Sequence, residues 1–126
     1  MAPEIIGKQM QLLKELIPKI SRIAVLWNPA NPSGPPQLQE AELAARVLKV
    51  QLQPLEARSG NDLDKAFAAM TRVRADGMIV VVDGMFIDSR IRLARLAEKA
   101  HLPAVYGLRE HVEVGGLMFY GASPVD

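Results

Sequence analysis

Two unbroken apolar runs, at 23–27 and 78–82, constrain the fold of this chain most. Such runs are typical of strands in a parallel sheet that helices cover on both faces, because no position then has to face water. Residues 4–17 carry a different pattern, in which Ile6, Met10, Leu13 and Ile17 recur at helical spacing before Pro18. Strands that alternate with helices predict an α/β domain built on a parallel sheet.

The rest of the chain alternates in the same way. After the first strand we expect a Pro-rich loop over 28–36, a helix from Pro35 or Pro36 to about 48 and a strand over 50–57. A helix should start near 59–62, with Ser59 or Asn61 as its cap, and another should cover about 86–100, with Ile87, Ile91, Ala94 and Ala97 on one face. The last expected elements are a strand over 102–106, a short helix near 108–113 and a strand near 116–120. Pro54 places the second strand at a sheet edge, because proline cannot donate to a ladder. The prediction is a three-layer, doubly wound, five-stranded parallel sheet with strand order 2-1-3-4-5.

Composition narrows the class of protein. The chain has 126 residues, of which 49% are hydrophobic and 23% charged, as in an ordinary globular domain. The net charge of +1 gives no general attraction to nucleic acid or to an anionic membrane, so neither is an expected partner. There are no cysteines for disulfides or thiolate sites. No apolar stretch is long enough to insert into a bilayer, and residues 1–8 do not read as a signal peptide.

Polar and amphipathic residues stand where the predicted strands end. Ligands of open parallel sheets bind beyond the carboxyl ends of the strands, so we expect binding residues there. The candidates at these ends are Asn28, Asn31, Ser33, Ser59, Asp83, Tyr106 and Tyr120. A purely structural interpretation stays open for several of them: Asn28, Ser33 and Ser59 can cap helices or turns, and Asp83 with Gly84 can form a tight turn or a helix cap.

The loop from Asn28 to Gly34 is the most informative segment. It leads into a helix N-terminus, where free N–H groups and a positive partial charge would suit a carboxylate or phosphate. Asp83 at a neighbouring strand end would suit an ammonium group, and Met85 with Phe86 could line a pocket beside it. The two sites together would suit a zwitterion such as an amino acid.

Catalytic and cofactor motifs are missing from the sequence. It contains no Gly-rich phosphate loop and no Ser-His-Asp or G-x-S-x-G arrangement, and neither His101 nor His111 has acidic residues at metal spacing. We therefore expect no enzyme activity, no cofactor and no metal. A receiver-like signalling domain, with Asp83 as phosphoacceptor, remains an alternative, although Trp27-Asn28 replaces the acidic pair that would hold Mg²⁺. The effector-binding lobe of a transcription regulator is another.

Three segments resemble the ABC-transporter substrate-binding proteins of the tryptophan/tyrosine type. They are Gly7-Lys8 with Leu12-Leu13-Lys14-Glu15, then Arg22-Ile23-Ala24-Val25-Leu26-Trp27-Asn28-Pro29-Ala30-Asn31-Pro32, and Pro103 to Glu110 continuing through Gly115 to Gly121. The family's common acidic residue is absent from the first loop, where Ala30 and Asn31 stand between the prolines.

The resemblance implies a type I periplasmic-binding-protein-like fold, of which residues 1–126 would be the second α/β lobe, excised from a two-lobe protein. The full protein would clamp a small molecule, amino-acid-like or a small organic acid, and deliver it to an ABC permease. It would be periplasmic or membrane-anchored outside the cytoplasm. The loop with Asn28, Asn31 and Ser33 would contact the carboxylate side of the ligand, and Asp83 and Tyr106 would lie beside the ligand at strand ends. Exposed inter-lobe surface would favour a homodimer of the isolated lobe.

Overall fold

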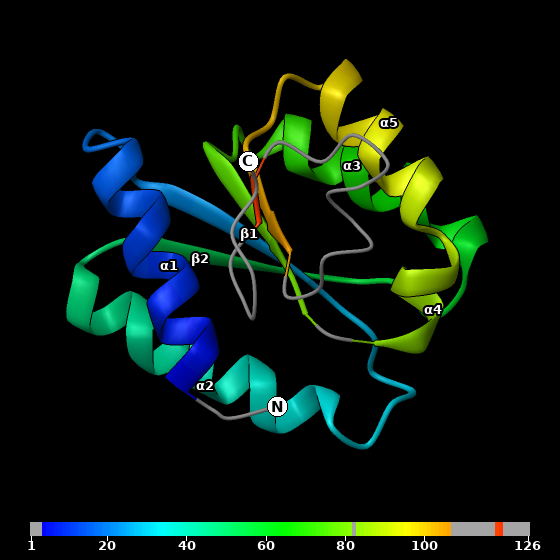
Figure 1. Cartoon of the computed structure of the whole chain (residues 1–126), viewed down its shortest axis with the longest axis horizontal. Coiled ribbons are helices and arrows are strands. Elements are labelled where there is room, and N and C mark those ends of the chain that lie inside the picture. The colour runs from blue at the N-terminus through cyan, green and yellow to red at the C-terminus, as the bar shows by residue number, and fades with distance from the viewer. Residues whose placement is uncertain (1–3, 82, 107–117, 120–126) are drawn as a thin grey trace.

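The computed structural model describes residues 4–81, 83–106 and 118–119. Helices and strands alternate along the chain (Figure 1). The elements in order are α1 (Glu4–Leu16), β1 (Arg22–Trp27), α2 (Gly34–Leu48), β2 (Gln51–Glu56), the 3₁₀ turn η1 (Gly60–Asp62), α3 (Leu63–Arg72), β3 (Gly77–Val80), α4 (Gly84–Asp88), α5 (Arg90–Lys99), β4 (Ala104–Tyr106) and β5 (Met118–Phe119). The α/β prediction is confirmed.

The strands form one parallel sheet with the order β2-β1-β3-β4-β5, which is the predicted order. β1 lies between β2 and β3, with Val25 opposite Pro54 on one side and Ile79 on the other. β2 is an edge strand, as its proline predicted. The carboxyl ends of β1 and β3 are therefore neighbours, which brings the segments after Trp27 and Val80 together.

Helices cover both faces of the sheet. α1 and α2 pack against each other and against β1, β2 and β3, whereas α3, α4 and α5 gather on the other face (Figure 1). The side chains of β1 and β3 between them are almost completely buried, as their unbroken apolar sequences predicted. α1 contributes Ile6, Met10 and Leu13, all fully buried, so its apolar stripe faces the core as predicted.

One predicted helix is divided. Instead of a single helix over 86–100, α4 and α5 are separated at Ser89, whose φ of −98° and ψ of 16° are not helical. In α5, Leu93, Ala94 and Ala97 are buried, whereas Ile91 lies off their face and is exposed. The expected position of Ile91 in the core was therefore wrong.

The amino ends of the strands are joined by the Asp76 carboxylate. Its Oδ2 accepts hydrogen bonds from the backbone N–H of Ser21 at 2.9 Å, the Ser21 hydroxyl at 3.2 Å and the N–H of Arg22 at 3.1 Å. These contacts, led by the bond from the Ser21 N–H, hold the pKa of Asp76 below its usual value. Asp76 thereby fixes the start of β1 against the turn that precedes β3.

In the described part of the chain, no helix is both long enough and apolar enough to cross a membrane. The helix expected near 108–113 lies outside the described residues, and so does Tyr120.

Candidate functional site

An acid–amide cluster lies where β1 and β3 end. The Asp83 carboxylate, which follows β3, accepts a hydrogen bond from Asn28 Nδ2 at 3.3 Å and one from Asn31 Nδ2 at 2.6 Å. Asn28 and Asn31 belong to the loop after β1, so these bonds join the ends of two strands. In sequence, Asn28 is 55 residues and Asn31 is 52 residues from Asp83. Asp83 is 5% exposed and Asn28 8% exposed, which makes them two of the few buried polar side chains of the core. The predicted meeting of these residues is confirmed.

The cluster continues from Asn31 into α2. Asn31 Oδ1 accepts hydrogen bonds from the N–H of Ser33 at 3.0 Å and from the Ser33 hydroxyl at 2.9 Å. Gln37, one turn into α2, donates to the carbonyl of Ser33 at 3.1 Å and approaches its hydroxyl oxygen at 3.4 Å. A connected chain of hydrogen bonds thus runs from Gln37 through Ser33 and Asn31 to Asp83. Gln37 was not predicted, and its spacing of four residues from Ser33 was the available signal.

Asp83 also caps α4. Its Oδ2 accepts from the N–H of Met85 at 2.9 Å, so the predicted helix-cap interpretation is confirmed for this residue. Asn28 makes a local turn, since its Oδ1 accepts from the N–H of Ala30 at 2.9 Å. Ser33 and Ser59 occupy the N-cap positions of α2 and η1, but neither makes a side-chain cap bond. The capping interpretation that the sequence left open for Ser33, and for Ser59 as an alternative to Asn61, therefore holds for the positions of these residues and not for their hydroxyls.

Gly34 begins α2 where the backbone and an indole ring leave no room for a side chain. A Cβ on Gly34 would lie 2.6 Å from the Asn28 carbonyl oxygen and 3.2 Å from Trp27 Cε3. The Trp27 Nε1 atom is buried and has no hydrogen-bond partner among the described residues. Trp27 therefore packs over the start of α2, and Gly34 is the residue that allows this contact.

The N-terminus of α2 does not present the free N–H groups that the sequence suggested. Its first four N–H positions are Ser33, Gly34, Pro35 and Pro36. Ser33 donates to the Asn31 side chain, Gly34 donates to the Asn31 carbonyl at 2.8 Å, and the two prolines have no N–H. The expectation of an anion seat built from these groups was wrong, because the loop uses two of the donors and proline removes the others.

The charge of Asp83 is surrounded by neutral donors. The two Asn amides and the Met85 N–H are its partners in the structure. The ion pairs of the described residues, Arg58 with Glu56 and Arg92 with Asp64, lie elsewhere. Within the described ranges no group of three or more His, Asp or Glu side chains is placed to hold a metal ion.

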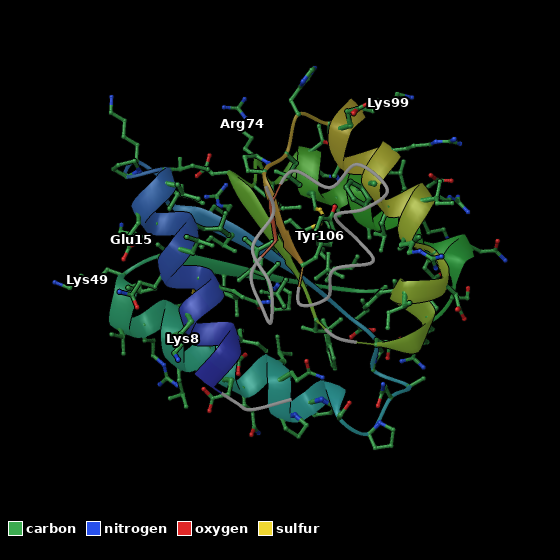
Figure 2. All side chains as sticks on the ribbon, in the orientation of Figure 1. Lys8, Glu15, Lys49, Arg74, Lys99 and Tyr106 are labelled. Carbon is green, nitrogen blue, oxygen red and sulfur yellow. The ribbon has the colours of Figure 1, made fainter. Side chains whose placement is uncertain are left out.

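The remaining candidates lie at different depths. Phe86 and Tyr106 are fully buried in the core, and Figure 2 shows Tyr106 in the middle of the molecule while Lys49 and Lys99 point outward. Burial raises the pKa of Tyr106 to about 12, so its phenol stays neutral at physiological pH. Met85 is half-buried, and its sulfur lies 4.0 Å from the Ser89 hydroxyl. Ser59 precedes η1, beyond the β2 end, and makes no side-chain bond to the acid–amide cluster in the structure.

This architecture, a parallel sheet ordered β2-β1-β3-β4-β5 with its polar cluster at the carboxyl ends of β1 and β3, is that of a lobe of the type I periplasmic-binding-protein-like fold. Residues 3–126 match the family model of the ABC transporter substrate binding proteins. The chain belongs to this family, whose members are solute-binding transport proteins and not a class of enzymes.

Solved structures share this fold. The chain is similar to a conserved domain protein from Vibrio cholerae, with a TM-score of 0.85 and 20% identity over 94% of this chain and 40% of that one. An ABC domain from Streptococcus pneumoniae in complex with L-Trp gives the same four values. A branched-chain amino acid ABC transporter structure from Thermus thermophilus with bound valine has a TM-score of 0.71 and 18% identity over 96% of this chain and 33% of that one.

The chain therefore spans about two fifths, or less, of the length of these structures. At such identities the likeness shows the fold alone. No protein in the curated set matches the sequence.

Proposed function

We propose that this chain is one lobe of a two-lobe solute-binding protein that serves an ABC importer. The full protein closes around a small molecule, amino-acid-like or a small organic acid, and presents it to a membrane permease outside the cytoplasm. The lobe acts by binding and carries out no chemical reaction. The observation that carries the proposal is the buried acid–amide cluster of Asn28, Asn31 and Asp83, because it lies at the carboxyl ends of adjacent strands, where sheets of this kind bind ligands.

The family match favours this function over the two alternatives. A receiver domain needs its acceptor aspartate open to a phosphodonor and a metal, whereas the Asp83 oxygens are engaged by two amides and a backbone N–H. A regulator's effector-binding lobe shares the fold, but the matched family is one of transport proteins. Two of the similar solved structures hold an amino acid ligand, L-Trp in one and valine in the other.

Calorimetric titration of the full-length protein tests the proposal. L-Tryptophan, L-valine and benzoate are suitable first probes, because solved structures similar to this chain hold these molecules. We expect saturable binding of at least one amino acid or organic acid from a panel built around them. Asn31→Ala should weaken that binding by about tenfold, since it removes the bond between the loop and Asp83.

Asn61→Ala is the matched control, because Asn61 is an exposed residue of η1 and has no part in the cluster. The proposal is wrong if no amino acid or organic acid binds the folded protein. It also fails if Asn31→Ala and Asn61→Ala bind equally well.

A further inference from the structure

We infer that the end of this lobe opposite the acid–amide cluster binds the anionic surface of a lipid bilayer. The inference goes beyond the proposed function and does not depend on the identity of the solute. It concerns a set of lysines and arginines around the amino ends of the strands, which we call the amino-end basic face. Its members are Lys14, Arg46, Lys49, Arg72, Arg74 and Lys99.

The topology of the sheet gathers these side chains at one end of the lobe. All the strands run parallel, so every helix that leads into a strand ends beside the amino ends of the strands. α1, α2, α3 and α5 each have a basic residue in the last turn, and these residues are Lys14, Arg46, Arg72 and Lys99. The helix dipole favours a cation at such a position, so this part of the face alone requires no partner.

The turns after the helices have a feature that the dipole does not explain. Lys49, Arg74 and His101 have φ of 59°, 59° and 54°, and they are the non-glycine residues with positive φ in the described part of the chain. Glycine is the usual residue at the end of a helix in this conformation, because it has no Cβ to clash with the backbone. The turns into β2, β3 and β4 each have a basic residue instead. A strained conformation kept for a particular side chain points to a use for that side chain.

The cations of this face are not paired, in contrast to those at the other end of the sheet. The ion pairs of the described residues, Arg58 with Glu56 and Arg92 with Asp64, both lie toward the carboxyl ends of the strands. No side chain of the amino-end basic face forms an ion pair or a hydrogen bond with another described residue. All of its members except Lys14 are exposed. Their charges are therefore available to a partner.

The net charge of +1 conceals this distribution. The acidic residues that the described structure places at the same end are Glu15, Asp76 and Glu98. The Asp76 carboxylate is already engaged by Ser21 and Arg22. The amino end thus keeps an excess of positive charge, which an average over the whole chain does not show. Local excess, and not net charge, determines whether a surface attracts an anionic partner.

The arrangement of the cations favours a broad anionic surface over a single small anion. Figure 2 shows Lys49, Arg74 and Lys99 extending outward at well-separated points, so they cannot converge on one phosphate group. Val47, in the last turn of α2 between Arg46 and Lys49, is 78% exposed. Basic side chains around an exposed apolar one suit a bilayer, because the cations meet anionic headgroups while the apolar side chain reaches the acyl boundary. This combination favours a lipid surface over an acidic protein.

Vesicle flotation of the full-length protein tests the inference. We expect binding to vesicles with about 30% phosphatidylglycerol in phosphatidylcholine at about 50 mM salt, and loss of most of it at about 0.5 M salt, where charges are screened within a few ångströms. Each cation near such a surface is worth about fivefold in affinity, so Lys49→Glu, Arg74→Glu and Lys99→Glu together should weaken binding about a hundredfold or more. Far-ultraviolet circular dichroism checks that the variant is folded.

The matched control reverses three other charges. Lys8→Glu with Lys65→Glu and Arg95→Glu changes the net charge by the same amount at exposed residues that lie outside the amino-end turns. This variant should weaken vesicle binding by less than about fivefold, because long-range attraction alone is affected.

A second pair of variants distinguishes a membrane from an acidic protein as the partner. Val47→Ser removes the exposed apolar side chain and should weaken vesicle binding several-fold. Leu43→Ser, one turn earlier in α2 and at a residue that is 52% exposed, should not. If the two variants bind vesicles equally well, the lipid assignment is wrong and an acidic protein is the better partner for this face.

The outcomes also separate this inference from the proposed function. Absence of binding to the anionic vesicles at low salt would overturn the inference, and so would equal losses in the two triple variants. Calorimetric titration with solutes should be unaffected by either triple variant, because both leave the acid–amide cluster intact. A negative vesicle result therefore leaves the solute-binding function standing, and failure of every solute to bind leaves the vesicle result standing.

Discussion

At the scale of single residues, hydrogen bonds to two aspartates hold the two ends of the sheet together. Asp76 joins the amino ends of the strands, and Asp83 joins the carboxyl ends. Both are acceptors for groups from the segments that flank β1. The role of Asp83 was among the predictions, but that of Asp76 does not follow from the sequence, because Asp76 stands in an Asp-Gly pair that equally signals a turn.

Asp76→Asn should lower the free energy of unfolding by about 1 kcal/mol at pH 7, because a neutral amide accepts more weakly from the Ser21 and Arg22 N–H groups. The pKa of Asp76 is lowered in the folded protein. Its contribution is therefore present above the unfolded-state pKa of about 3.9 and is lost as the pH falls through the lower folded-state value. Denaturant unfolding between pH 7 and pH 2 should show less loss of stability in acid for the variant. An unaltered acid profile would contradict this, and Asp88→Asn serves as the exposed control.

Gly34→Ala should destabilise the fold by about 1–3 kcal/mol, the usual cost of overpacking. The new Cβ would lie 2.6 Å from the Asn28 carbonyl oxygen, and backbone cannot give way as the end of a side chain can. Gly84→Ala is the matched control, because nothing lies within 4 Å of a Cβ there and the change also favours the helix. Thermal denaturation of both variants measures the difference. Equal melting temperatures would show that the loop after β1 is free to move away.

At the scale of elements, the sequence predicted best where one pattern acted alone. The apolar runs of β1 and β3 and the stripe of α1 needed no tertiary information, and each was placed to within a few residues. The helix expected over 86–100 is divided because Ser89 leaves the helical conformation. The helical spacing of apolar residues continues across such a break, so the sequence pattern does not reveal it. The donors at the start of α2 were misjudged for a related reason, since the bonds that Asn31 makes to the next residues are invisible in a spacing pattern.

Pro54 protects the open edge of β2. The N–H of Gln51 donates to the Ser21 carbonyl just before β1 at 2.7 Å, and the N–H of Ala57 donates to the Trp27 carbonyl at 3.0 Å. The nitrogen of Pro54, three positions from each, therefore points away from β1. Proline costs no ladder bond at this position, and it removes a donor from the outer edge.

Pro54→Thr should therefore leave the fold intact and raise concentration-dependent self-association. Sedimentation velocity at several protein concentrations measures this change. Gln53→Thr, on the same strand, is the control, because its N–H points toward β1. Equal sedimentation of the two variants would mean that the edge is protected by something other than the missing donor.

At the scale of the whole molecule, one core connects both layers of helices through the sheet. Buried residues from α1, α3 and α5 belong to the same cluster as the strands, so loss of one layer should weaken the others. Fully buried Leu13 also touches the place where β3 begins, since a Cβ on Gly77 would lie 3.4 Å from Leu13 Cδ2.

Leu13→Ala should cost about 2–5 kcal/mol and should shift a single unfolding transition. Leu16→Ala, in the same helix but 57% exposed, should change the stability by less than about 0.5 kcal/mol. Calorimetry together with far-ultraviolet circular dichroism checks both values. A variant in which α1 unfolds separately, before the rest, would show that the helix is an appendage and not part of the core.

The packing of Trp27 over Gly34 has a practical consequence. Trp27 is the single tryptophan of the chain, and it lies next to Asn28 at the start of the loop after β1. Its indole emission therefore comes from one place, beside the junction of β1 and α2. A movement of the loop that changes the water around the ring would shift the emission wavelength, so the lobe contains its own fluorescent reporter of that movement.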